Sequence, residues 1–114
     1  MKRSEIWLIN LNPTIGAETQ KTRPAIIVND DDLGLLPLRV IVPLTDWKER
    51  YAAAAWMVKI EPDGNNNLTK MSAADCFQVR SVSQNRFVRK IGDAASVEML
   101  KIETALARVL KIEL

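Results

Sequence analysis

The sequence predicts a mainly β protein, in which short strands form a small, curled antiparallel sheet or barrel and one helix ends the chain. Two observations point to this class. Short apolar runs recur through residues 5–91 and are separated by clusters of Gly, Pro, Asn and Asp, which is the pattern of strands joined by turns. Residues 94–110 contain neither Pro nor Gly and repeat apolar residues at helical spacing.

The first two predicted strands differ in their patterns. Residues 5–11 alternate in polarity and are rich in Ile, Trp and Leu, and turn residues at positions 12–16 end this strand. Residues 23–29 form a near-continuous apolar run, which indicates a central strand. Pro24 is compatible with that assignment because a strand loses little when its starting residue lacks an N–H.

The third predicted strand, residues 38–44, contains Pro43. A proline within a strand indicates an edge or a bulge, so we expect Thr45 to be tilted out of the ladder. The remaining strands are expected at residues 55–60, 71–79 and 87–91, with a turn at residues 62–67 and a helical turn at residues 83–85.

The C-terminal segment predicts one amphipathic helix packed on the sheet. Asp93 or Ser96 is expected to cap its first turn. The side chains at the spacing of one helical face are Met99, Ile102, Leu106 and Val109.

Length and composition limit the possible functions. A chain of 114 residues with 47% hydrophobic and 26% charged residues is long enough for one core, so we expect a single domain over residues 1–114. The net charge of +2 is small, so nucleic-acid binding would need local clustering of cations. No histidine is present, which removes the commonest general base and most catalytic zinc ligand sets.

The cysteine content and hydropathy predict a cytoplasmic protein. Cys76 is the single cysteine, so it forms no intrachain disulfide, and we expect it to be a small buried apolar residue. No apolar stretch approaches the ~20 residues of a membrane span, and the N-terminal apolar run is too short for a signal peptide. We therefore expect a soluble chain without a membrane partner.

The loop at residues 16–24 holds the residues with the most chemistry. It carries Glu18, Lys21 and Arg23 directly before the apolar run. Two cations and one carboxylate on a loop held by strands suit a ligand that carries phosphate. A structural alternative is an ion pair of Arg23 with Glu18 or Glu5.

This loop and further motifs resemble the MazF/PemK toxins, which are bacterial ribosome-independent mRNA endoribonucleases. Each motif is weak alone, but their order and spacing are specific and extend over nearly the whole chain. The matching positions are residues 6–8, 12–14, 16, 18, 21, 23–25, 28, 42–45, 72, 78–82, 86–87 and 91–92.

The resemblance implies an SH3-like barrel with a C-terminal α-helix that acts as a homodimer. It also implies cleavage of single-stranded mRNA at short specific sequences, with 2′,3′-cyclic phosphate and 5′-hydroxyl ends and without a metal or other cofactor. The expected protein partner is a cognate antitoxin that covers the RNA groove.

By the same resemblance, Arg23 corresponds to the family's catalytic arginine, Thr45 to its catalytic threonine and Glu18 to an acid in the same loop. Gln78 and Arg80 correspond to positions near the RNA groove or the dimer seam. A guanidinium suits the charge of a phosphorane, and the threonine hydroxyl adds one donor. Glu18 is expected either to act as the base or to orient Arg23, and both roles stay open.

Aromatic and basic side chains extend the expected RNA surface. Trp47 and Lys48 follow Thr45, and aromatic residues beside cations are typical of single-strand binding. The alternative is that Trp47 anchors packing and Trp56 belongs to the core. The other expected RNA contacts are Lys21, Gln78, Arg80 and Arg86; by default the last two, with Lys70, Arg89 and Lys90, form a solvated basic face.

Two other functions stay open. Asp46 puts a carboxylate beside the expected phosphate site, where many members of the resembled family have a hydroxyl residue, so one alternative is a barrel that binds RNA without cleaving it. The other is a CcdB-like gyrase-binding toxin, which shares this barrel but does not need Arg23 or Thr45.

Overall fold

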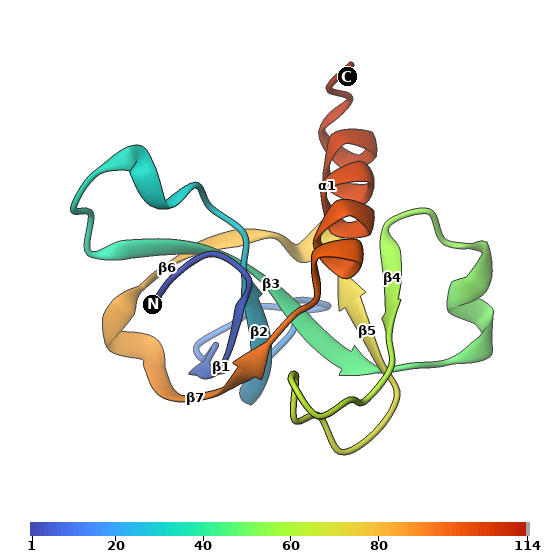
Figure 1. Ribbon diagram of the computed structural model, residues 1–114, viewed down its shortest axis with the longest axis horizontal. Helices are drawn as coiled ribbons and strands as arrows, with labels where there is room; N and C mark the ends of the chain where they lie inside the picture. Colours follow the sequence, from blue (N-terminus) through green and yellow to red (C-terminus); the bar gives the residue numbers. More distant parts are fainter. Residues whose placement is uncertain (114) are drawn as a thin grey trace.

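The computed structural model describes residues 1–113, which contain seven strands and one α-helix (Figure 1). The strands are β1 (Glu5–Asn10), β2 (Thr22–Ile27), β3 (Leu38–Asp46), β4 (Met57–Ile60), β5 (Ser72–Asp75), β6 (Arg80–Ser83) and β7 (Phe87–Asp93). The helix is α1 (Ser96–Leu110), and short 3-10 helices lie at Asp31–Leu33, Glu49–Ala53, Cys76–Gln78 and Gln84–Arg86. None of the described helices is long and apolar enough to cross a membrane.

The strands form one antiparallel sheet. Six of them lie in the order β4-β5-β3-β2-β1-β7, and β6 also pairs with β3. Within residues 1–113 no ladder joins the two end strands, so the sheet is curled like a barrel without being closed. The predicted mainly β class with one C-terminal helix is confirmed.

β3 is the central strand of this sheet, and the prediction that Pro43 marks an edge or bulge is wrong. One edge of β3 pairs with β2, and the other pairs first with β6 and then with β5. Pro43 lies where the partner changes from β6 to β5, so its missing N–H removes no bond of those ladders. Thr45 therefore stays in the ladder, opposite Ala73 of β5.

The sheet buries apolar side chains on both faces, because consecutive residues of a strand point to opposite sides. On one face Ile26 and Val42 pack with Met99 and Ile102 of α1. The other face holds a smaller cluster of Ile9, Leu11, Ala25, Ile27, Ile41 and Val82. α1 packs beside β4, and its C-terminal end stands away from the sheet (Figure 1).

The helix is confirmed, but neither Asp93 nor Ser96 caps it. The N-cap is Ala95, whose backbone N–H donates to Glu98 Oε1 at 3.0 Å. This is the glutamate half of a capping box. The Asp93 carboxylate instead pairs with Lys90 at 3.2 Å.

The segment after β4 contains the main errors of the strand prediction. The expected strand at residues 71–79 ends at Asp75, because the Asp75 carboxylate accepts the Phe77 N–H at 3.2 Å and starts a 3-10 helix. The chain then re-enters the sheet as β6, which the pattern did not predict. The helical turn expected near residue 84 is confirmed, and the Ser83 hydroxyl caps it by accepting the Asn85 N–H at 3.2 Å.

Candidate active site

Arg23 and Thr45 lie on neighbouring strands and line the same hollow. The ladder between β2 and β3 ends at the pair Ala25 and Pro43, and Arg23 and Thr45 each lie two residues beyond that end. The hollow has a volume of about 310 Å³, and we call it the Arg23 hollow. The other polar residues of its lining are Lys21, Thr22, Asp46, Thr69, Lys70 and Ser72.

The Arg23 hollow has an excess of positive charge. Lys21, Arg23 and Lys70 contribute three cations, and Asp46 contributes one carboxylate. Asp46 is neutralised by Lys70, whose Nζ lies 2.9 Å from Asp46 Oδ1. Cations gathered in a hollow of a sheet suit an anionic ligand such as a phosphodiester.

The half-buried Arg23 side chain is fixed by the main chain. Its Nε donates to the carbonyl oxygen of Gln20 at 3.1 Å. Among residues 1–113 no carboxylate pairs with Arg23, so the alternative of an ion pair with Glu18 or Glu5 is wrong. The guanidinium is therefore oriented by a carbonyl that leaves its charge uncompensated.

Glu18 does not line the Arg23 hollow. It lines a neighbouring hollow of about 520 Å³, which we call the Gln78 hollow, together with Leu11, Pro43, Phe77, Gln78 and Arg80. The Glu18 carboxylate accepts the backbone N–H of Ile15 at 3.1 Å, three residues earlier in the same loop. The structure thus does not bring Glu18 together with Arg23.

Three of the residues predicted to contact RNA bind the backbone of the loop between β1 and β2 or the strand end before it. The Gln78 side chain accepts the Thr19 N–H and donates to the Ala17 carbonyl at 3.4 Å. Arg80 donates to the carbonyl of Leu11 at 3.4 Å, and Arg86 donates to the carbonyls of Asn10 and Asn12. These side chains come from the segment 76–86 and hold the loop that carries Glu18 and Lys21.

The same loop is also closed at its base. The Leu11 N–H donates to the Lys21 carbonyl at 3.0 Å, and the Lys21 N–H donates to Asn12 Oδ1 at 3.0 Å. Lys21 takes a left-handed backbone conformation with φ of 70°. Because β2 starts at the next residue, this closure fixes where Lys21 and Arg23 enter the Arg23 hollow.

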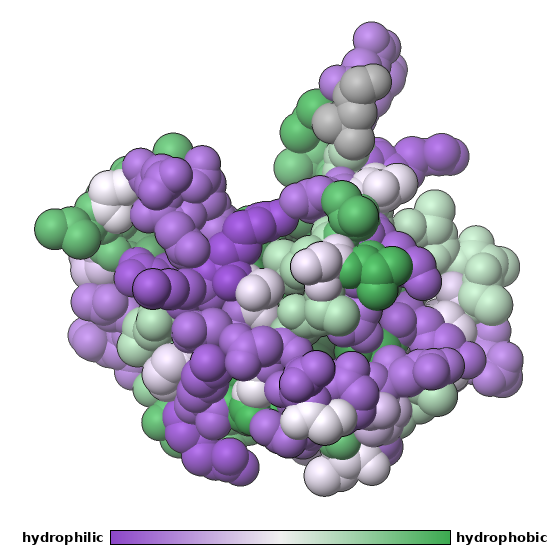
Figure 2. All heavy atoms as spheres, viewed as in Figure 1, coloured by the Kyte–Doolittle hydropathy of each residue, from purple (hydrophilic) through white to green (hydrophobic). Residues whose placement is uncertain are grey.

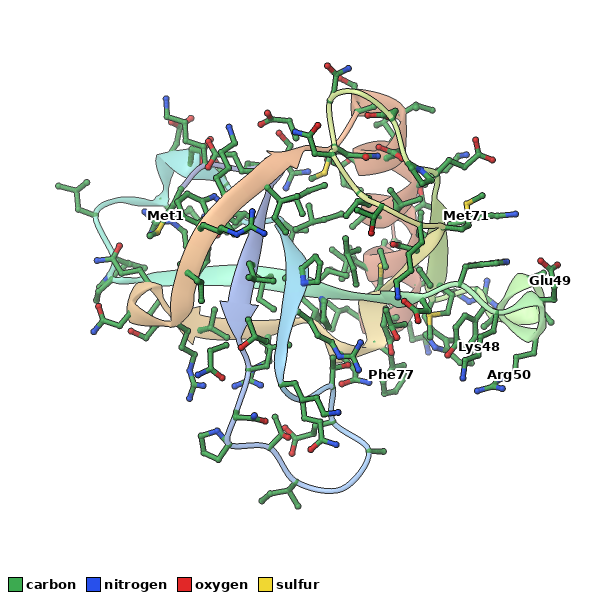
Figure 3. The ribbon with its side chains drawn as sticks, turned by 90° about the horizontal axis from the view of Figure 1, so that it is seen from below. Met1, Lys48, Glu49, Arg50, Met71 and Phe77 are labelled. Atoms are coloured by element: carbon green, nitrogen blue, oxygen red, sulfur yellow. The ribbon has the colours of Figure 1, made fainter. Side chains whose placement is uncertain are left out.

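Trp47 and Lys48 lie on the connection between β3 and β4. The half-buried Trp47 ring packs edge-on against Tyr51 at 5.8 Å, and the Lys59 Nζ lies 5.2 Å from its centroid, which fits the packing-anchor alternative. Lys48 is exposed, beside Glu49 and Arg50 at the tip of this connection (Figure 3). Trp56 is 41% exposed and packs on Phe77 at 6.1 Å, so the expectation that it belongs to the core is wrong.

Two buried groups beside the Gln78 hollow have shifted pKa values. Burial, together with the Asp75 charge, raises the pKa of the Cys76 thiol to about 12, so the thiol is a protonated core group as predicted. Burial also raises the pKa of Asp75, although hydrogen bonds from Gln78 and Phe77 oppose this shift. In the part of the chain that the structure describes, no three His, Cys, Asp or Glu side chains gather as metal ligands would.

Sequence reasoning missed the roles of Lys70 and Asp75. Lys70 is exposed, as expected of a solvated face, but it also lines the Arg23 hollow and neutralises Asp46. Asp75 lies in a strand as expected, at the end of β5, and in addition its Oδ2 accepts the Gln78 amide at 3.1 Å and so orients the side chain that holds the loop. The Asp-x-x-Gln spacing at a strand end was the available signal for the second role.

Comparison with known proteins places these features in a family. The family model of the PemK-like, MazF-like toxins of type II toxin–antitoxin systems matches residues 2–110. Endoribonuclease MazF9 of Mycobacterium tuberculosis is 28% identical over 112 residues, which cover 93% of this chain and 92% of that protein.

Solved structures share the fold. MazF from Deinococcus radiodurans superimposes with a TM-score of 0.81 at 17% identity, over 98% of this chain and 97% of that one. An endoribonuclease from a mycobacterial species, solved in complex with its cognate antitoxin, gives a TM-score of 0.78 at 19% identity, over 100% of this chain and 98% of that one. Because the family model covers nearly the whole sequence, the chain belongs to the PemK-like, MazF-like toxin family of type II toxin–antitoxin systems.

Proposed function

We propose that this chain is an endoribonuclease toxin that cleaves single-stranded mRNA at short specific sequences and leaves 2′,3′-cyclic phosphate and 5′-hydroxyl ends. The observation that carries the proposal is the Arg23 hollow, in which Arg23 and Thr45 share one lining. The endoribonuclease MazF9, similar along most of its length, supports the reaction class.

The reaction needs little chemistry beyond positioning and charge. The ribose 2′-oxygen attacks the adjacent phosphorus, the bond from phosphorus to the 5′-oxygen breaks, the 2′-hydroxyl loses a proton and the 5′-oxygen gains one. The Arg23 guanidinium stabilises the charge on the equatorial phosphorane oxygens, and the Thr45 hydroxyl donates one more hydrogen bond. No water is consumed, so a hollow that holds one phosphodiester suffices.

The closest alternative within this fold is a barrel that binds RNA without turnover, and its basis was Asp46. The ion pair of Asp46 with Lys70 weakens that basis, because the carboxylate no longer acts as an isolated negative charge beside the phosphate. Catalysis is therefore the better-supported function of the Arg23 hollow.

The test is incubation of the purified protein with an end-labelled single-stranded RNA in EDTA. We expect cleavage at a few defined sites, and we expect polynucleotide kinase to phosphorylate the downstream fragments without prior phosphatase treatment, as a 5′-hydroxyl requires. Binding without cleavage would support the RNA-binding alternative, and indifference to RNA with capture of gyrase would support the gyrase-binding one. The matched control is Arg89→Ala, which removes an exposed arginine of β7 outside the Arg23 hollow.

The proposed partners are a cognate antitoxin and a second copy of the chain, in the cytoplasm. Exposed apolar side chains, which mark an interaction surface where they form a patch, occur on the connection between β2 and β3 with the first residue of β3, and on α1. They are Leu33, Leu35, Leu36 and Leu38, and Val97, Leu100 and Leu110. Figure 2 shows hydrophobic residues on that connection and beside the base of α1, on an otherwise largely hydrophilic face. Light scattering on the isolated protein should give the mass of two chains.

A further inference from the structure

We infer that Lys70 is a second phosphate-binding cation of the Arg23 hollow and that Asp46 is the positioning residue that fixes its ammonium group. The inference rests on the proposed function, since it assigns a contact to the same RNA substrate. Its chemical target is a phosphate of the RNA backbone, the one next to the scissile phosphate.

Lys70 lies two residues before β5, and its backbone is held beside the sheet although its side chain is exposed. Asp46 at the end of β3 pairs with Ser72 at the start of β5. The Ser72 hydroxyl donates to the Lys70 carbonyl at 3.1 Å, and the Trp47 N–H donates to the Met71 carbonyl at 3.1 Å. The backbone of Lys70 is therefore tied to the edge of the Arg23 hollow from two sides.

The ion pair then selects where the ammonium lies. Lys70 Nζ is 2.9 Å from Asp46 Oδ1, and Asp46 directly follows Thr45. An ammonium group has three N–H donors, so pairing with one carboxylate oxygen leaves two donors for a ligand. Without this pair, a lysine with four flexible bonds would sample many positions along the rim.

The charge balance of the hollow supports a phosphate role. With Lys21, Arg23 and Lys70 against Asp46, the hollow keeps two net positive charges, one for each of two successive phosphates. Arg23 and Thr45 account for the scissile phosphate in the proposed reaction. Lys70 precedes β5, which pairs with β3 on the edge opposite β2. Its charge therefore extends the positive surface of the hollow away from Arg23 of β2, and we expect the RNA backbone to follow that direction.

The test compares Lys70→Met, Lys70→Arg, Asp46→Asn and the Asp46→Asn/Lys70→Met double variant with the natural protein. Lys101→Met, which removes an exposed lysine of α1 outside the Arg23 hollow, is the matched control. Two quantities are measured at several salt concentrations: kcat and KM for cleavage of a single-stranded RNA, and Kd for the same oligonucleotide with 2′-deoxyribose, which cannot undergo the attack.

We expect Lys70→Met to raise KM and Kd by about 3- to 10-fold whatever the base sequence, with kcat nearly unchanged and the salt slope of binding smaller by about 0.7. Lys70→Arg should retain most of the affinity. Asp46→Asn should raise KM by about two- to threefold by loosening Lys70, and it should add nothing in the Lys70→Met background.

An unchanged Kd and salt slope in Lys70→Met would overturn the phosphate contact. Asp46→Asn that lowers KM equally with and without Lys70 would overturn the positioning role, since Asp46 would then only repel RNA. If the natural protein did not cleave RNA but Lys70→Met still raised the Kd for the oligonucleotide, the proposed function would be refuted and the phosphate contact of Lys70 would stand. Absence of any oligonucleotide binding would refute both.

Discussion

The two neighbouring hollows of this molecule share a loop but differ in what their side chains do. In the Arg23 hollow, the polar groups bind each other little: Arg23 makes one bond to a carbonyl, and Asp46 pairs with Lys70. In the Gln78 hollow, Gln78, Arg80 and Glu18 all bind main-chain groups of residues 10–19. One hollow presents charge, and the other holds the loop.

The difference teaches that RNA-contact residues expected from a family pattern can be of two physical kinds. A side chain whose donors and acceptors are occupied by the protein contributes to function by keeping a loop in place. A side chain with uncompensated charge in a hollow contributes by meeting the ligand. Substitutions should separate these kinds, since the first should change loop stability and the second should not.

The largest expected effect is that of Arg23→Ala. We expect kcat/KM for RNA cleavage to fall by about 10³-fold, because the main stabiliser of the phosphorane charge is removed. The free energy of unfolding in urea should change by less than about 0.5 kcal/mol, since no carboxylate loses a partner. Cleavage near the natural rate by a folded Arg23→Ala protein would remove Arg23 from the mechanism.

The second-largest effect is expected for Thr45→Val, in which kcat should fall by about 10²-fold. Valine keeps the β-branched shape and the backbone pairing with Ala73, so only the hydroxyl is lost. Thr45→Ser, which keeps the hydroxyl, should recover most of the activity. Near-natural activity of Thr45→Val would remove the hydroxyl from the mechanism, because valine keeps the methyl group and lacks only the hydroxyl.

Much of the fold could be predicted from the sequence, because periodicity and turn residues are local signals. The errors arose where a long-range pairing decided the structure. A proline within a strand indicates an edge when the strand has a single partner along each of its two edges. One edge of β3 changes partner from β6 to β5 at Pro43, and neighbouring residues in the sequence carry no signal of that change. β6 itself is four residues long and polar at most positions, too short for a periodic pattern.

The candidate site could be predicted only in part, again because long-range contacts decide much of it. The shared hollow of Arg23 and Thr45 depends on β2 and β3 lying side by side, and only the resemblance pointed to these two residues together. The roles of Gln78 and Arg86 depend on contacts 59 and 74 residues away in sequence, with Thr19 and Asn12. No spacing rule reveals such contacts, so the bonds of Arg86 to carbonyl oxygens could not be predicted from its charge.

Gln78→Ala tests a side chain whose hydrogen bonds hold the loop between β1 and β2 in place. Loss of the bonds to Thr19 and Ala17 should loosen the loop and shift Lys21, with about a tenfold fall in kcat/KM. Limited proteolysis should cut within residues 12–20 faster than in the natural protein. A similar fall in activity with unchanged proteolysis would mean that Gln78 contacts RNA directly.

Glu18→Gln should have the smallest effect and decides the open role of that residue. The glutamine keeps an oxygen that can accept the Ile15 N–H, so the loop turn should persist. Because Glu18 lines the Gln78 hollow and not the Arg23 hollow, we expect kcat/KM to fall by less than about threefold, whereas removing a positioned base costs about 10²–10⁴-fold.

A loss of kcat/KM above about 10²-fold in Glu18→Gln would contradict the loop role. Glu18 would then return to the reaction, and the loop would have to move it toward Arg23 when RNA binds.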